Sequence, residues 1–108
     1  MKIIKSKNYE KDYKKKILNK YKQKEIDRIQ SIEELVLDSE NLKSLLLNPL
    51  SLVYNIRQKE GVLKEIFTAN VNSKIRLYMK PIGEYPYNKI EIKSIEFLKI
   101  DDKHYGEG

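Results

Sequence analysis

Residues 74–80, Lys-Ile-Arg-Leu-Tyr-Met-Lys, alternate strictly between polar and apolar side chains. Successive side chains of a β-strand point to opposite faces of a sheet, so this period of two predicts a strand with one face in a core. The core face would hold Ile75, Leu77 and Met79. The other face would hold three cations and a phenol: Lys74, Arg76, Lys80 and Tyr78. Those groups suit phosphate binding and base stacking, although a merely solvated strand face is an open alternative.

Length and composition bound the class of protein. The chain has 108 residues, which predicts one domain spanning residues 1–108. It contains no Cys and one His, His104, so disulfides are excluded and neither a metal site nor a cofactor is expected. No apolar run reaches the length of a membrane span, and the first residues are too short for a signal sequence. We therefore expect a cytoplasmic protein without a membrane segment.

Positive charge is concentrated in two stretches of the chain. The formal net charge is +6, and residues 1–28 hold eleven Lys and Arg against four Asp and Glu. Residues 57–80 hold six such cations against two acids. A basic balance favours polyanionic partners, which are either nucleic acids or acidic proteins, and it does not choose between them.

The first half of the chain predicts a strand followed by helices. Residues 2–5 read as a short strand, and the Ser6 hydroxyl can cap the helix that follows. Apolar stripes at helical spacing predict helices over about 9–21 and 26–36, and the capping-box spacing of Ser31 and Glu34 predicts that a helix restarts there. A shorter helix at 42–46 should stop at Asn48-Pro49, because the residue before a proline avoids the helical conformation.

After Pro49 the pattern changes from helix to strand. We expect extended chain over 52–57, a turn at 58–61, a strand over 62–71, a tight connection at 72–73 and a loop at 81–88. The last strand, 90–100, changes the parity of its apolar residues, which predicts a bulge near Ser94 or burial on both faces. This order predicts an α+β fold, with the N-terminal strand and helices packed on one face of a mainly antiparallel sheet.

Several short motifs occur in an order that resembles one protein family. They are Leu47-Asn48-Pro49-Leu50, Tyr54-Asn55-Ile56-Arg57, Gly61, the hairpin over 67–77 and the acidic, His and Tyr tail at 101–105. With the basic N-terminal strand and helical hairpin, they resemble the RelE/ParE superfamily of toxins from bacterial type II toxin–antitoxin modules, and within it the HigB-like host-inhibition killer proteins. The resemblance spans nearly the full length of the chain.

The resemblance implies a microbial-RNase-like fold and a metal-free endoribonuclease, an mRNA interferase. Such an enzyme cleaves mRNA, usually on the translating ribosome, and so inhibits translation and arrests growth. The resemblance also implies a cognate antitoxin encoded beside the toxin, here a helix-turn-helix protein of the HigA-like kind.

Metal-free RNA cleavage needs a base for the 2′-hydroxyl, cations for the charged phosphorane and an acid for the leaving oxygen. Arg76 matches the arginine of the family's second hairpin strand and would stabilise the phosphate charge. His104 has the only side chain whose unperturbed pKa lies near neutrality, and Asp101 and Asp102 could orient it. Tyrosines could stack a base or donate a proton, and those proposed for the catalytic set are Tyr54 and Tyr105. Further RNA-binding candidates are Arg57, Lys64, Lys74, Tyr78, Lys80, Lys14 and Lys15.

Three classes of function remain open at this point. The chain could be a toxin ribonuclease, a non-catalytic module that binds RNA or the ribosome, or a ParE-type toxin that inhibits gyrase. An interaction protein with an acidic partner belongs with the third class. For His104 taken alone, a solvent-exposed tail residue is the alternative to a catalytic group.

Overall fold

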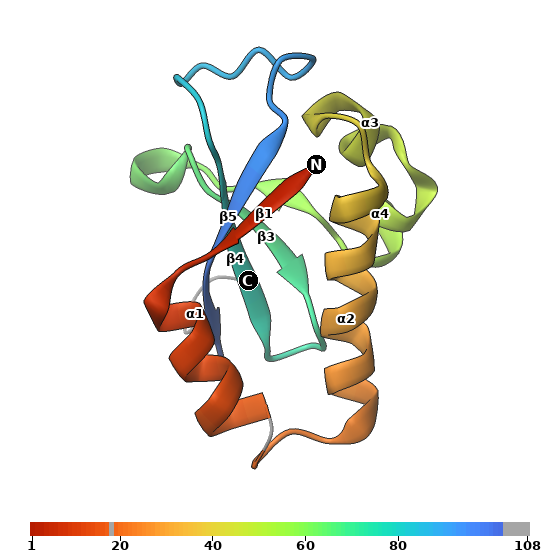
Figure 1. The fold of residues 1–108 in the computed structure, drawn as a ribbon, viewed down its shortest axis with the longest axis vertical. Helices are drawn as coiled ribbons and strands as arrows, with labels where there is room; N and C mark the ends of the chain where they lie inside the picture. The colour runs from red at the N-terminus through yellow and green to blue at the C-terminus, as the bar shows by residue number, and fades with distance from the viewer. Residues whose placement is uncertain (18, 103–108) are drawn as a thin grey trace.

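A five-stranded sheet forms the centre of the computed structural model, which describes residues 1–17 and 19–102 (Figure 1). The strand order is β1-β5-β4-β3-β2. The strands are β1 (Lys2–Lys5), β2 (Arg57–Gln58), β3 (Phe67–Asn70), β4 (Arg76–Pro81) and β5 (Ser94–Asp101). Only β1 and β5 pair in parallel among these, so the predicted mainly antiparallel sheet is confirmed.

The helices pack on one face of this sheet, as predicted. They are α1 (Lys7–Asp12), α2 (Gln23–Asp38), α3 (Leu42–Leu47) and α4 (Pro49–Val53), with a π-helical turn η1 (Tyr13–Ile17) and a 3₁₀ turn η2 (Gly61–Leu63). Tyr9 of α1 meets Phe97 of β5 edge-on, with ring centroids 5.4 Å apart. Ile32 of α2 joins the same core, so α1 and α2 cover one face together.

Two capping signals in the sequence have different outcomes. Ser6 caps α1 as predicted, because its Oγ accepts the Tyr9 N–H at 3.0 Å and donates to the Leu98 carbonyl at 2.6 Å. The predicted helix restart at Ser31 is wrong, since α2 runs unbroken from Gln23 to Asp38. Buried side chains lie on both sides of Ser31, so packing of the apolar stripe keeps the helix continuous.

The predicted change to extended structure after Pro49 is also wrong. Asn48 Oδ1 accepts the Leu50 N–H at 2.9 Å, and Pro49 occupies the first helical position, so α4 begins there. Leu52 is 85% exposed, which shows that its apolar side chain does not mark a buried strand. The strand expected over 62–71 is likewise shorter, because η2 precedes β3.

The core face of β4 is as predicted, and the bulge in β5 lies at a different residue. Leu77 and Met79 are fully buried. Tyr78 pairs with Lys99 but Met79 pairs with Phe97, so Leu98 is the extra residue. The predicted bulge near Ser94 is therefore corrected to Leu98, and the strand begins at Ser94 rather than at Ile90.

The connection between β3 and β4 is tight, as expected at 72–73. Asn72 Oδ1 accepts the N–H groups of Lys74 and Ile75, each at 2.7 Å. The Asn72 amide also donates to the Glu25 carboxylate, which ties the hairpin to the start of α2. Across residues 1–17 and 19–102, no helix is both long and apolar enough to cross a membrane.

Candidate nucleic-acid interface

The face of the sheet opposite the helices carries a row of polar side chains across four strands. Pairing places Arg57 of β2 opposite Thr68 of β3, and Thr68 opposite Tyr78 of β4. Tyr78 in turn lies opposite Lys99 of β5. Residues directly opposite one another share a face of the sheet, so all four side chains project from the same side. We call this set, Arg57, Thr68, Tyr78 and Lys99, the open-face row.

The phenol in this row is covered rather than open. Lys99 Nζ lies 4.7 Å from the centroid of the Tyr78 ring, within the range of a cation–π contact. Tyr78 is only 6% exposed. It lies on the predicted face of β4, but the expectation of an open ring for a stacked base does not match this burial. An RNA contact by Tyr78 stays a prediction, with Lys99 as the more accessible member of the pair.

Arg76 begins β4 next to this row, on the same face. It lies opposite Asn70 of β3 and Asp101 of β5. Its Nη1 donates to the Asn72 carbonyl at 2.8 Å and contacts the Ile75 carbonyl at 3.4 Å. These backbone acceptors hold the half-buried guanidinium in one orientation, which suits a planar fork that binds an oxyanion through two N–H groups.

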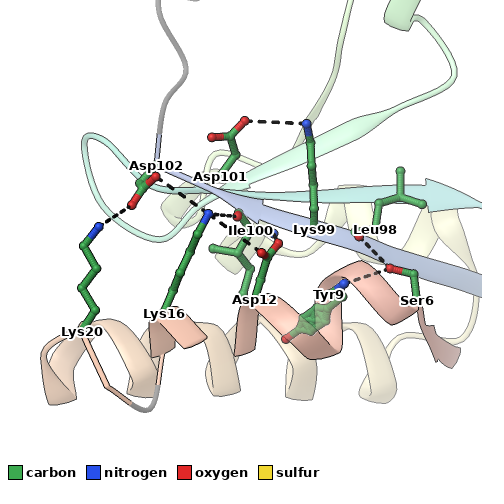
Figure 2. Close-up of polar contacts among 10 residues, drawn as sticks. All are labelled: Ser6, Tyr9, Asp12, Lys16, Lys20, Leu98, Lys99, Ile100, Asp101 and Asp102. Atoms are coloured by element: carbon green, nitrogen blue, oxygen red, sulfur yellow. Dashed lines mark hydrogen bonds and ion pairs between the residues drawn. The ribbon is translucent and has the colours of Figure 1, made fainter. Parts of the chain in front are cut away.

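The two aspartates at the end of β5 point in opposite directions (Figure 2). Asp101 Oδ2 lies 3.6 Å from Lys99 Nζ, on the face that Arg76 shares. Asp102 instead reaches the helix side, where its Oδ2 accepts from Lys20 Nζ at 3.3 Å. Successive side chains of a strand alternate between faces, so the structure brings Asp101 to Arg76 but does not bring Asp102 there.

Asp102 belongs to an ion-pair cluster between η1 and the end of β5. Lys16 Nζ lies 3.9 Å from both Asp12 and Asp102 and donates to the Ile100 carbonyl at 3.3 Å. Partial burial favours protonated Asp102, but the hydrogen bond from Lys20 and the charges of Lys16 and Lys20 outweigh it and lower the pKa of the carboxyl. Burial, and then the charge of Asp102, raise the pKa of the Tyr21 hydroxyl. The cluster fastens the last turn of η1 to β5.

Tyr54 also lies on the helix side of the sheet. Its ring packs against the core, with the Arg28 guanidinium of α2 at 5.0 Å from the ring centroid. Its carbonyl accepts the Asn70 N–H at 2.7 Å, so its backbone lies near the Arg76 end of the hairpin. The ring itself is not brought into the open-face row.

The remaining predicted cations are spread over the surface. Arg57 lines a hollow of about 390 Å³ beside Lys59 and Glu60, and Lys80 lines one of about 360 Å³ beside Ile4 and Glu96. The others lie at the β3–β4 turn, beside the Tyr85 ring and on η1, and they are Lys74, Lys64, Lys14 and Lys15. His104 and Tyr105 lie outside the described residues.

Lys99 is the member of this face that the sequence pattern missed. It has the same parity as the buried Ile95 and Phe97, so simple alternation assigns it to the core face. The extra residue Leu98 turns Lys99 to the open face and keeps Ile100 in the core. The parity change over 90–100 is the available signal, but it does not show on which side of Phe97 the bulge lies: a bulge near Ser94 leaves Lys99 on the core face, and one at Leu98 turns it outward.

This combination of one sheet with helices on a single face defines a small α+β fold that is shared with solved bacterial toxins. No protein-family model matches the sequence, and no curated protein matches it either. YafQ from E. coli strain BL21(DE3) has a TM-score of 0.67 at 18% identity, over 98% of this chain and 97% of YafQ. A YoeB/ParE toxin from Agrobacterium tumefaciens has a TM-score of 0.64 at 9% identity, over 94% and 98%. The shared fold therefore extends over nearly the whole of each chain.

The same fold is also present in a solved complex. The E. coli DinJ-YafQ complex matches with a TM-score of 0.65 at 18% identity, over 98% of this chain and 97% of the matched chain. The expected RelE-like architecture is thus confirmed at the level of the fold.

Proposed function

We propose that this chain is the toxin of a type II toxin–antitoxin module and that it acts as an endoribonuclease on mRNA. The observation that carries the proposal is the fold shared with YafQ and with a YoeB/ParE toxin over at least 94% of this chain. The basic open face supplies groups suited to the reaction. The HigB-like subtype and the dependence on the ribosome stay predictions.

The proposed chemistry is displacement at phosphorus by the neighbouring 2′-oxygen. A base takes the 2′-hydroxyl proton, the oxygen forms a bond to phosphorus, and the bond to the 5′-oxygen breaks as that oxygen gains a proton. Negative charge grows on the non-bridging oxygens at the phosphorane, and in the proposed mechanism Arg76 and Lys99 stabilise it. His104 keeps the proposed role of acid or base, and Asp101 is the aspartate that shares the face of Arg76.

The proposed mechanism uses no metal ion. In the part of the chain that the structure describes, no three or more His, Cys, Asp or Glu residues are grouped so as to hold one. If the reaction is metal-free as proposed, cleavage should proceed in the presence of a chelator. Its loss on chelation, with recovery on adding a divalent ion, would contradict the metal-free mechanism.

A cognate antitoxin is the proposed protein partner. YafQ has been solved as a toxin–antitoxin complex with DinJ. By analogy we propose that a protein encoded beside this chain binds and neutralises it, and a helix-turn-helix, HigA-like antitoxin is the expected kind. The ribosome and mRNA are the proposed targets of the free toxin.

Expression in bacteria tests the proposal directly. The chain alone should arrest growth, and co-expression of the neighbouring reading frame should relieve the arrest. Purified protein should cut ribosome-bound mRNA in a single-turnover assay. Normal growth with soluble protein present would contradict the toxin role, and RNA binding without cleavage would leave a non-catalytic module.

Gyrase inhibition is the second candidate, because one of the matching structures is described as a YoeB/ParE toxin. A gyrase inhibitor would arrest growth with DNA damage and without RNA cleavage. Measuring supercoiling by purified gyrase beside the cleavage assay separates the two candidates.

A further inference from the structure

The outer side of α1 and η1 carries a stripe of exposed lysines. Lys7, Lys11 and Lys14 are spaced by four and three residues, which places them on one side of a helix, and Lys15 lies beside them. All four side chains are exposed. We call this set the lysine stripe, and two shallow hollows lie along it.

The lysines of the stripe make no ion pair with the rest of the described chain. Ion pairs hold other lysines, such as Lys5 with Glu33 and Lys20 with Asp102. Among the described residues, no carboxylate oxygen lies within 4.0 Å of an ammonium group of the stripe. The nearby Asp12 is engaged by Lys16 and by the Ile100 N–H at 3.0 Å. The exposed Glu10 lines both hollows without an ion pair to any described residue, so four lysines stand against one carboxylate and the stripe presents an excess of positive charge to solvent.

The stripe and the open-face row lie on opposite sides of the molecule. Tyr9 lies on the side of α1 that packs on Phe97, and at 100° per residue Lys7 and Lys11 lie across the helix from it. The open-face row projects from the far side of the sheet. A helix about 10 Å in diameter and the sheet thus separate the two basic surfaces, so one nucleotide cannot contact both.

We propose that the lysine stripe is a second nucleic-acid surface, which binds the phosphate backbone of duplex RNA while the open face holds a single strand. Tyr9 beneath the stripe is buried and Tyr13 beside Lys14 is half-buried, so this surface offers four exposed charges and only one partly accessible ring. From Lys7 to Lys14 the stripe is about 10 Å long, a length over which a duplex presents about six phosphate charges. A duplex has the highest density of negative charge among nucleic acids, so it is the best match to the lysine stripe.

Such contacts would position the protein rather than read sequence. Holding structured RNA on one side raises the local concentration of a single strand at the other, without any new contact at the cleavage site. The inference rests on the proposed function only in the choice of RNA as the polyanion.

A charge-neutralising variant with a matched control tests the proposal. Lys7→Gln, Lys11→Gln and Lys14→Gln together remove three charges, while Lys43→Gln, Lys89→Gln and Lys93→Gln remove three exposed lysines elsewhere. Binding of a labelled RNA duplex is measured against salt. The salt slope is the change in log affinity with log salt concentration, and each lost phosphate contact lowers its magnitude by about 0.9. For three lost contacts, the slope of the stripe variant should be smaller by about 2.7. Between about 50 and 200 mM salt, its loss of affinity should then be about 40-fold smaller than that of the wild type.

Competition distinguishes two surfaces from one. A saturating unlabelled short oligouridine should leave duplex binding in place, and the stripe variant should keep its affinity for that oligouridine. An unchanged salt slope in the stripe variant, an equal loss in the control variant, or full displacement of the duplex by the oligouridine would each overturn the proposal. Binding is measured here without cleavage. A protein that shows the expected salt slope and competition but does not cleave RNA would therefore contradict the proposed nuclease activity and still support the second surface.

Discussion

The two basic surfaces differ in how the fold holds their charges. On the open face, Arg76 is fastened by backbone carbonyls and Lys99 lies over the Tyr78 ring, 3.6 Å from Asp101. On α1 and η1, the lysines of the stripe stand exposed and without a described ion pair. A group held in one orientation can stabilise charge that develops at a defined atom, whereas long flexible ammonium groups serve attraction at a distance. A catalytic site and a docking surface can therefore be distinguished by whether protein contacts fix the orientation of their cationic side chains.

The largest effect is expected from Arg76→Ala. Losing one preorganised donor to the phosphorane should lower single-turnover cleavage of ribosome-bound mRNA by about 10²-fold or more. Thermal unfolding should change little, because the half-buried side chain makes hydrogen bonds worth about 1 kcal/mol and fills no core space. Arg76→Lys should recover only part of the rate, since an ammonium lacks the planar fork. Near-wild-type cleavage by Arg76→Ala would remove this residue from the site.

Lys99→Met should give a smaller loss, of about tenfold, in the same cleavage assay. The substitution keeps an unbranched side chain over the Tyr78 ring and removes the charge. Lys89→Met, an exposed lysine in the loop before β5, serves as the control. Equal activity of the two variants would show that Lys99 supports the Tyr78 ring without acting on RNA.

The ion-pair cluster around Asp102 should contribute to the stability of the fold in a pH-dependent way. The pKa of Asp102 is lowered in the folded state, so its contribution is present above the unfolded value near 3.8 and is lost as pH falls through the folded value. The charged and titratable groups facing it are Lys16, Lys20, Tyr21 and Asp12.

Asp102→Asn should therefore cost about 1 kcal/mol at neutral pH and less below pH 3.8. Thermal unfolding at the two pH values measures this, with Asp38→Asn at the exposed end of α2 as the control. A penalty that does not shrink in acid would mean that Asp102 stabilises the fold through something other than its charge. A large loss of cleavage in this variant would place Asp102 in the catalytic site after all.

Local chemistry was enough to predict much of the scaffold. The alternation over 74–80 correctly assigned Ile75, Leu77 and Met79 to the core, because side-chain period follows from strand geometry alone. The Ser6 cap of α1 was predictable because the hydroxyl and the Tyr9 N–H that it accepts lie within one helical turn of the chain. Arg76 was placed on its face by the same alternation.

Tertiary structure decided the features that depend on a partner strand or on packing. Whether Pro49 begins a helix or a strand depends on its cap and on which apolar residues find a core, and Leu52 finds none. Alternation along β5 separates Asp101 from Asp102, but the bulge at Leu98 decides which of them shares the face of Arg76, and only pairing with β4 locates that bulge. The same bulge brings Lys99 onto the Tyr78 ring. Sequence spacing determines which side chains of one strand share a face. Cross-strand register determines which side chains of neighbouring strands lie in contact, and it depends on contacts between residues far apart in the chain.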